Sequence, residues 1–256
     1  MSILLTLAMQ SMNSLIEKGE VQIEDVPSTS SEKLDLRGIV VDADHLAGWS
    51  LDVYDKFRNF ADKANSPCLL VRDNTVLEFG DQKSEDSVER IRRLSVAANR
   101  LGCNAIAITP HFPDDEQRAA HIIEQLRSTM QYVERLELNL LLQPSEGLTS
   151  KPDPHIDIIK QVGGFRIGAL PTFSAAIATG DGIGALQKLA PYAGAIIADF
   201  PTGRGKKAIS LEDGLQAVID VGYSNTIALN YTGSGSPIPQ LSKASKALYA
   251  YLEAGD

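Results

Sequence analysis

The sequence is poor in cysteine, in positive charge and in long apolar runs. Its two cysteines, Cys68 and Cys103, stand in no CxxC or other metal-binding spacing, so we expect buried small side chains in a reducing compartment. No run reaches the roughly 18 consecutive apolar residues that a transmembrane helix requires. The apolar stretch Met1–Met9 lacks the basic residues that open a secretory signal peptide. We therefore predict a cytoplasmic protein with no membrane partner.

Negative charge outweighs positive charge. There are 24 Lys and Arg residues against 33 Asp and Glu residues, which gives a net charge of −9. A nucleic-acid-binding surface needs clustered positive charge to neutralise phosphates, so DNA and RNA are not expected partners. The same acidic balance disfavours docking on an anionic membrane surface.

Short apolar runs alternate with amphipathic segments along the chain. Eight runs are apolar on both faces, as expected for strands buried between a barrel interior and a layer of helices. The segments between them place apolar residues on one face at helical spacing. The eight runs are Ile3–Ala8, Gly38–Val41, Cys68–Val71, Ala105–Thr109, Leu138–Leu142, Arg166–Leu170, Ala195–Ala198 and Thr226–Leu229.

Caps and stops mark the ends of two predicted helices. Ser87 and Ser210 are expected to cap the N-termini of the segments that follow them. Gly102 and Gly222 are expected to end those segments, because glycine readily adopts the left-handed conformation that closes a helix. The polar stretch Glu20–Lys33 is expected to be a loop with a short first helix.

The number of strand–helix units favours a closed barrel. Such barrels typically have about 250 residues, close to the 256 of this chain. The alternative is an open doubly wound sheet, which usually has a glycine-rich turn after its first strand. Here Met9–Asn13 follows the first run and contains no glycine. We predict an α/β fold, a (β/α)₈ TIM barrel, that forms a single domain over residues 1–256.

Polar side chains follow the predicted strands. In a (β/α)₈ barrel the active site lies at the C-terminal ends of the strands, so these side chains are the candidates for function. They include Gln10, Ser11, Asp42, Asp44, His45, Arg72, His111, Gln143, Ser145, Glu146, Thr172, Asp199 and Asn230.

Three segments resemble one family of barrels. Residues 87–111 (SVERIRRLSVAANRLGCNAIAITPH), 140–147 (LLLQPSEG) and 210–235 (SLEDGLQAVIDVGYSNTIALNYTGSG) resemble the xylose isomerase-like superfamily. That group includes sugar and sugar-phosphate isomerases and epimerases, and endonuclease IV. Endonuclease activity is not expected, because its three-metal site uses many histidines and this chain has four.

The resemblance implies a metal site that this sequence cannot build. Family members usually hold one divalent metal with Glu, Asp, His and Glu after strands 5, 6, 7 and 8, and the two Glu often act as the acid–base pair. The matching positions here are Gln143, Pro171, an apolar residue within Ala195–Ala198, and Asn230. The amides lack the carboxylate charge, and the other two positions offer no ligand. We therefore expect no metal and no other cofactor.

Three rim residues are candidates for acid–base catalysis. His111 and Asp44 are placed to form an acid–base pair across two strands, since histidine transfers protons near neutral pH. Glu146 lies three residues beyond the missing glutamate and offers a displaced carboxylate. The structural alternatives are that His111 caps a helix and that Glu146 is a solvated loop acid. A relocated metal site of Asp199, Glu146 and His111 is a further alternative.

Other rim residues are candidates for substrate binding. Arg72 is expected to hold a carboxylate or phosphate, or else to pair with Asp73. Barrels often bind phosphate with the loops after strands 7 and 8, where the alternative is a flexible loop with solvated charge. The neutral amides are expected to donate hydrogen bonds. The predicted substrate-binding residues are His45, Arg72, Gln143, Asp199, Asn230, Arg204 and Lys206.

Three functional hypotheses stay open. The first is an isomerase or epimerase of sugars or sugar phosphates that works without the family's metal, since an enediol route needs only an acid–base pair and stabilisation of an oxyanion. The second is a non-catalytic pseudoenzyme that keeps a carbohydrate-binding cleft or serves as an interaction barrel. The third is a lyase or hydrolase acting on a polyol-like substrate. Fold does not decide between them, and the chain is compatible with a homo-oligomer.

Overall fold

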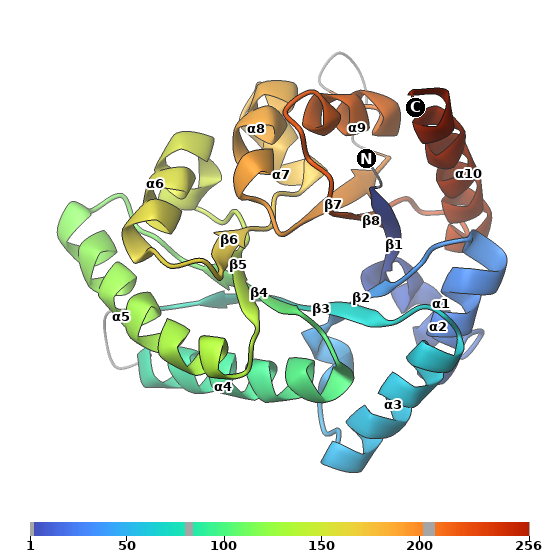
Figure 1. Ribbon diagram of the computed structural model, residues 1–256, viewed down its shortest axis with the longest axis horizontal. Coiled ribbons are helices and arrows are strands. Elements are labelled where there is room, and N and C mark those ends of the chain that lie inside the picture. The colour runs from blue at the N-terminus through green and yellow to red at the C-terminus, as the bar shows by residue number, and fades with distance from the viewer. Residues whose placement is uncertain (1–2, 80–83, 202–207, 256) are drawn as a thin grey trace.

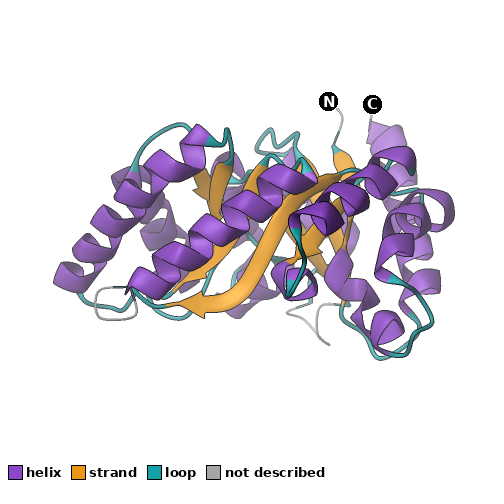
Figure 2. Cartoon of the chain, turned by 90° about the horizontal axis from the view of Figure 1, so that it is seen from below, coloured by secondary structure: helices purple, strands orange, loops and turns teal. Residues whose placement is uncertain are grey.

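The computed structural model describes residues 3–79, 84–201 and 208–255. Eight parallel strands form one curled sheet at the centre, and helices surround it (Figure 1). Seen from the side, the strands lie at the centre and the helices lie outside them (Figure 2). The chain is therefore the (β/α)₈ barrel that the alternation predicted.

Strands and helices alternate in chain order. The strands are β1 (Leu4–Ala8), β2 (Ile39–Asp42), β3 (Cys68–Leu77), β4 (Ala105–Pro110), β5 (Asn139–Leu142), β6 (Ile167–Ala169), β7 (Ala195–Phe200) and β8 (Thr226–Tyr231). The helices are α1 (Asn13–Glu17), α2 (Val26–Ser28), α3 (Leu51–Lys63), α4 (Ser84–Leu101), α5 (Glu116–Arg135), α6 (Pro152–Val162), α7 (Phe173–Ala178), α8 (Gly182–Leu189), α9 (Leu211–Ile219) and α10 (Pro237–Gly255). Short helical turns are η1 (Met9–Met12), η2 (Ile23–Asp25), η3 (Thr29–Lys33), η4 (Ala43–Leu46), η5 (Leu148–Ser150) and η6 (Ala190–Tyr192).

The sheet is continuous from β6 through β1 to β7, in the order β6-β5-β4-β3-β2-β1-β8-β7. Its two end strands, both fully described, share no ladder. They are joined by isolated bridges from Ala169 to Ala193 and from Thr172 to Ile197. A hydrogen bond from the Ile197 N–H to the Pro171 carbonyl, 3.0 Å long, helps to close this seam.

Side chains alternate between the barrel interior and the helical layer, as the pleat of a strand requires. Outward residues of the strands join the large core under the helices, as Leu5, Ile106 and Leu140 do. Inward residues form a second, smaller cluster, which is Ala8, Val40, Leu70, Ala105, Ala107, Leu141, Leu170, Ala195, Ile197 and Ala228. These two buried clusters explain why the predicted runs are apolar on both faces.

The predicted element ends are partly confirmed. Ser210 caps α9, since its hydroxyl oxygen accepts a 3.0 Å hydrogen bond from the Asp213 N–H. Gly102 and Gly222 follow α4 and α9 with φ of 77° and 81°. The prediction for Ser87 is wrong, because α4 already begins at Ser84 and the Ser87 hydroxyl donates to the Glu78 carbonyl, 2.6 Å away.

The predicted loop over 20–33 is also only partly correct. Helical turns occupy residues 23–33 without a break, in η2, α2 and η3. Buried Val26 and Ser30 tie these turns to the barrel, and the Ser30 hydroxyl donates to the Leu36 carbonyl 3.2 Å away.

Within the described residues, no helix is both long enough and apolar enough to cross a membrane.

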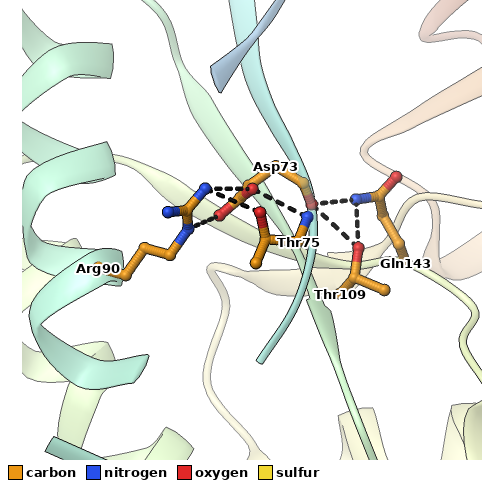
Figure 3. Close-up of polar contacts among 5 residues, drawn as sticks. All are labelled: Asp73, Thr75, Arg90, Thr109 and Gln143. Atoms are coloured by element: carbon orange, nitrogen blue, oxygen red, sulfur yellow. Dashed lines mark hydrogen bonds and ion pairs between the residues drawn. The ribbon is translucent and has the colours of Figure 1, made fainter. Parts of the chain in front are cut away.

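A buried ion pair ties β3 to α4. The Asp73 side chain is fully buried and accepts from the Arg90 Nη2, 2.9 Å from its Oδ1, and also from the Arg90 Nε (Figure 3). The same Oδ1 accepts from the Thr75 N–H at 3.0 Å. Since a buried carboxylate needs partners for its lost hydration, Arg90 anchors the part of β3 that carries the site residues.

We predict that Arg90→Ala lowers the free energy of unfolding by about 2–3 kcal/mol, because it leaves the buried Asp73 carboxylate short of donors. Urea unfolding measures this loss. Arg93→Ala is the matched control on the same helix, because Arg93 pairs with Glu89 at the surface. Equal losses in the two variants would contradict a special role for the Asp73 pair.

His155 of α6 is a buried histidine away from the rim. Its side chain is 0% exposed, and neither ring nitrogen makes a well-formed hydrogen bond, although backbone of Leu142 and Thr149 lies beside the ring. Burial lowers the pKa of His155 to about 4. The folded protein therefore holds this ring neutral at pH values where the unfolded chain protonates it.

We predict that stability contributed by His155 is present above pH 6.5 and is lost as the pH falls towards 4, because only the unfolded state then gains the proton. The loss is on the order of 3 kcal/mol. Unfolding of wild type and His155→Leu should be compared from pH 7 to 4.5. The difference in stability between them should shift with pH, whereas exposed His121→Gln should track the wild type. A constant difference would contradict the prediction.

Candidate functional site

The barrel interior turns polar at the carboxyl ends of its strands. Two residues beyond the last inward apolar side chain, the pleat again points inward, and a polar residue stands there for all eight strands. The one beyond β6, Thr172, caps α7, and the other seven are grouped here. Six of these side chains are at most 9% exposed, and the one after β1 lies open to solvent. We call this set the polar ring: Gln10, Asp42, Arg72, Thr109, Gln143, Asp199 and Asn230.

Arg72 of β3 crosses the mouth of the barrel. Its Nε donates to Gln143 Oε1 at 2.6 Å, and its Nη1 donates to Gln10 Oε1 at 3.2 Å. Those partners follow β5 and β1, which lie four strands apart in the eight-stranded sheet and therefore face each other. The guanidinium thus lies near the barrel axis. Its predicted alternative, pairing with Asp73, is wrong, because adjacent residues of a strand point to opposite faces and Asp73 binds Arg90.

Gln143 is held by bonds that only an amide can make. Its Nε2 donates to the Asp73 carbonyl oxygen and to Thr109 Oγ1, both 2.8 Å away (Figure 3). The Thr109 hydroxyl in turn donates to the Asp73 carbonyl at 2.9 Å. Since Nε2 faces two oxygens, Oε1 is directed to Arg72, and a carboxylate at this position would have no proton to give.

Asn230 and Asp199 form the opposite side of the ring. These residues are paired in register on β8 and β7, and Asn230 Nδ2 donates to Asp199 Oδ1 at 2.8 Å. The Ser174 N–H donates to Asp199 Oδ2 at 3.1 Å. Asn230 Oδ1 accepts from the Ser11 hydroxyl at 3.2 Å, and its Nδ2 also reaches Gln10 Oε1 at 3.4 Å. A continuous chain of bonds therefore leads from Asp199 through Gln10 to Arg72.

Asp42 is a buried ring residue with one carboxylate oxygen that makes no hydrogen bond within the described residues. It is 5% exposed, its Oδ1 accepts a long 3.5 Å bond from Asn74, and its Oδ2 bonds to none of the described residues. Burial raises the pKa of Asp42 to about 6, against the attraction of Arg72 and with repulsion from Asp44. The carboxyl group therefore changes protonation near neutral pH, which an ordinary Asp does not.

One guanidinium and two carboxyl groups share this buried space. Burial lowers the pKa of Arg72, while Asp42 and Asp199 raise it by their charge, and an arginine remains protonated throughout. Two of the five guanidinium N–H groups are bonded as described above. The other three have no acceptor among the described residues, so they are free to bind a ligand oxygen.

The structure brings together four of the predicted substrate-binding residues, namely Arg72, Gln143, Asp199 and Asn230. His45 lies to one side, where its Nε2 is 2.9 Å from Asn13 Oδ1 and burial lowers its pKa. The two basic residues predicted to bind phosphate, Arg204 and Lys206, lie outside the described residues.

The predicted catalytic residues stand around the ring rather than in it. Asp44 is exposed in η4, two residues beyond Asp42. His111 is half-buried after β4, and the cap of α5 is Asp115, so His111 does not cap that helix. Glu146 is exposed and, with Lys151, lines a cavity of about 410 Å³ beside the ends of β5 and β6. Their catalytic roles stay predictions.

Three ring residues had no assigned role in the sequence prediction, namely Thr109 at the end of a predicted strand and two that follow a predicted strand. Asp42 is the last residue of β2, and Gln10 lies in η1. The signal that identifies them is parity, because each stands two residues beyond an inward apolar side chain, Val40 or Ala8. By that rule Asp42, the last residue of β2, points into the barrel. Asp44 lies beyond the strand, in η4, where the alternation of a strand no longer applies.

A divalent cation does not fit the ring as it is built. Gln143 Oε1 already accepts from the cationic Arg72, and Asn230 Oδ1 accepts from Ser11. Across residues 3–79, 84–201 and 208–255, no three His, Cys, Asp or Glu side chains gather closely enough to hold a metal ion. The relocated site of Asp199, Glu146 and His111 is therefore not formed.

Known proteins resemble this chain in structure and not in sequence. No protein-family model and no curated protein sequence matches it. An L-ribulose 3-epimerase is similar with a TM-score of 0.79 at 11% identity, over 99% of this chain and 95% of that one. The D-psicose 3-epimerase of Clostridium cellulolyticum H10, with D-tagatose, gives 0.77 at 13% identity, over 97% and 99%.

A third solved structure carries another chemistry on the same scaffold. The probable 3-DHS dehydratase AsbF of Bacillus anthracis gives a TM-score of 0.74 at 14% identity, over 97% of this chain and 99% of that one. Identities this low establish the fold alone. The resemblance seen in the sequence is thereby confirmed for architecture: the chain has the fold of the xylose isomerase-like TIM barrels.

Proposed function

We propose that this barrel catalyses proton transfer at a carbon next to a sugar carbonyl, as an isomerase or epimerase that uses no metal. The observation that carries the proposal is Asp42, a buried carboxyl group with one unpaired oxygen and a pKa of about 6, beside the Arg72 guanidinium. A general base titrating near the working pH and a fixed cation are the two parts that such a reaction needs.

The two side chains take complementary roles. Ionised Asp42 accepts the proton from the carbon next to the carbonyl. The electron pair of the broken C–H bond forms a C=C bond, and the π pair of the carbonyl moves to its oxygen. The unpaired N–H groups of Arg72 bind the enediolate oxygen so formed, and they are already in place before charge develops. When the proton of the adjacent hydroxyl moves to the enediolate oxygen, that hydroxyl oxygen becomes the new carbonyl, and return of the first proton to the former carbonyl carbon gives the isomer. Return of a proton to the opposite face of the same carbon gives the epimer.

The charge of the ring favours an uncharged sugar at the reacting end. One guanidinium faces two carboxyl groups, Asp42 and Asp199, so the ring offers no excess of positive charge to an anion. The open amide of Gln10 suits the hydroxyl groups of a polyol. A sugar phosphate would need a separate anion site, for which Arg204 and Lys206 are the candidates.

Epimerisation needs a second proton carrier on the opposite face of the substrate, whereas isomerisation needs only one. Asp199 lies across the ring from Asp42, since β7 and β2 are separated by β8 and β1. Its two oxygens already accept from Asn230 and from the Ser174 N–H. The remaining candidates for the second proton carrier are His111, Glu146 and Asp44, which the sequence suggested.

Two other functions stay as proposals. Proton abstraction beside a carbonyl also begins the elimination of water, so a lyase acting on a polyol-like substrate would use the same pair, and one similar structure is a probable dehydratase. A non-catalytic sugar-binding barrel is supported by the two amides, Gln143 and Asn230, at the positions where the family has catalytic glutamates.

We predict that Asp42→Asn lowers kcat by 100-fold or more, because general-base catalysis typically contributes about 10²–10⁴. Sugars incubated with the protein in D₂O report the step directly, since a base that exchanges its proton introduces deuterium beside the carbonyl. Wild-type kcat/KM should fall tenfold per pH unit below about 6, where Asp42 becomes protonated.

Two sets of variants separate this prediction from its rivals. Asp157→Asn, at an exposed position of α6, is the control that should behave as wild type. His111→Ala and Glu146→Ala should abolish turnover if the residues suggested by the sequence carry the proton. Full activity in Asp42→Asn would refute the role of Asp42, and absence of turnover with any sugar would favour the binding barrel.

We predict that Arg72→Lys lowers kcat at least tenfold without unfolding the protein. A lysine keeps the charge, but its ammonium is a point charge that cannot bridge Gln143 and Gln10 in one plane and still face a substrate oxygen. Steady-state kinetics measure the loss, and circular dichroism verifies the fold. A variant with unchanged kcat would show that the charge alone is sufficient.

A further inference from the structure

We propose that the guanidinium of Arg72 takes the place of the divalent cation that the family's barrels hold, so that this chain has an internal, covalently attached cation. The inference goes beyond the proposed reaction, because it concerns which cation the ring accepts and its readout is binding. It holds whether or not the protein turns over a sugar.

The first step is that the positive charge of Arg72 lies among the positions that match the family's metal ligands. Arg72 reaches from β3 to partners after β5 and β1, which places its guanidinium across the barrel mouth. Of the four positions that match the family's ligands, one is bonded to it directly, through Gln143 Oε1 at 2.6 Å. A second, Asn230, is linked to it through the shared acceptor Gln10 Oε1. The cation therefore stands among the residues that replaced the ligands.

The second step is the chemistry of those replacements. Gln143 must accept from Arg72 and at the same time donate to the Asp73 carbonyl and Thr109. Asn230 likewise donates to Asp199 and accepts from Ser11. A carboxylate cannot donate, so an acid at either position would place its oxygens against other oxygens. The two amides therefore suit a cation that donates N–H hydrogen bonds. A metal ion would instead need several ligand atoms that each offer a lone pair.

The third step is charge. Two nearby carboxyl groups, Asp42 and Asp199, interact with Arg72 and offset its single positive charge. A divalent ion added beside the guanidinium would be repelled and would find its amide ligands already bonded. Arginine and metal therefore exclude each other at this site.

Mutual exclusion leads to a test by exchange. The triple variant R72M/Q143E/N230D removes the guanidinium and restores acids at two ligand positions, beside Asp199 and Asp42. With Mn²⁺ or Co²⁺ at about a hundred times the dissociation constant, its Tm should rise by about 5–10 °C over a sample with EDTA. Wild type should show no rise with either metal.

The matched control keeps the guanidinium. Q143E/N230D carries the same two acids, but Arg72 remains to pair with them, so its Tm should not respond to metal. Equal metal responses in the double and triple variants would overturn the inference, because the guanidinium would then not be what excludes the metal. A metal response of wild type would overturn it as well.

A second measurement covers a triple variant that does not fold. Arg72→Ala leaves a gap in the shape of the guanidinium, and millimolar guanidinium chloride should raise its Tm relative to sodium chloride at equal ionic strength. Wild type should show no such rise. If neither guanidinium in Arg72→Ala nor metal in the triple variant raises Tm, Arg72 is not a replaceable cation and the inference fails.

Discussion

A guanidinium enclosed at the mouth of the barrel dictates the arrangement of the side chains around it. A buried cation must recover in hydrogen bonds and opposing charge what it loses in hydration. Arg72 does so with acceptors from both sides of the mouth, Gln143 and Gln10, and with the fields of Asp42 and Asp199. Each acceptor is fixed in turn, so that one charged side chain orders a network from β3 to β8.

The same arrangement leaves part of the bonding capacity unused. Asp42 has an unpaired buried oxygen, and three N–H groups of Arg72 have no acceptor among the described residues. Folding alone would favour filling such groups, since an unsatisfied buried polar atom costs about 1–3 kcal/mol. In the proposed reaction these groups stay open for the substrate. The stability that the ring gives up is supplied elsewhere, by the two apolar clusters and the ion pair of Asp73 with Arg90.

The sequence predicted the fold more fully than the site, for a physical reason. A strand buried on both faces can be recognised from its own sequence, because its residues must all be apolar, as those from Ile39 to Val41 are. The strands proved longer than the apolar runs at β3 and β7, where inward positions become polar, so that Asp199 lies within a strand. The Ser87 cap failed because Ser87 lies inside α4 and bonds the Glu78 carbonyl instead.

Which rim residues meet is a non-local property. Arg72, Gln143 and Asn230 were recognised as site residues, but their connection depends on how far one side chain on β3 extends across the barrel. The choice of Asp44 over Asp42 shows the limit of chain proximity, since the two differ by two positions and end in opposite environments, exposed and buried. The end of β2 separates them, because Asp42 is the last residue of the strand and Asp44 lies in the helical turn η4 that follows it.

The barrel has the weakest connection between neighbouring strands at the seam between β6 and β7. Seven of the eight neighbouring strand pairs share a ladder, whereas this pair relies on bridges such as the one from Thr172 to Ile197. The molecule is therefore a curled sheet whose two edge strands meet through isolated bridges, rather than a barrel with a continuous ladder all round. New chain ends placed in the segment between β6 and β7 would interrupt the fewest strand-to-strand hydrogen bonds, so a circular permutant opened there should retain the polar ring.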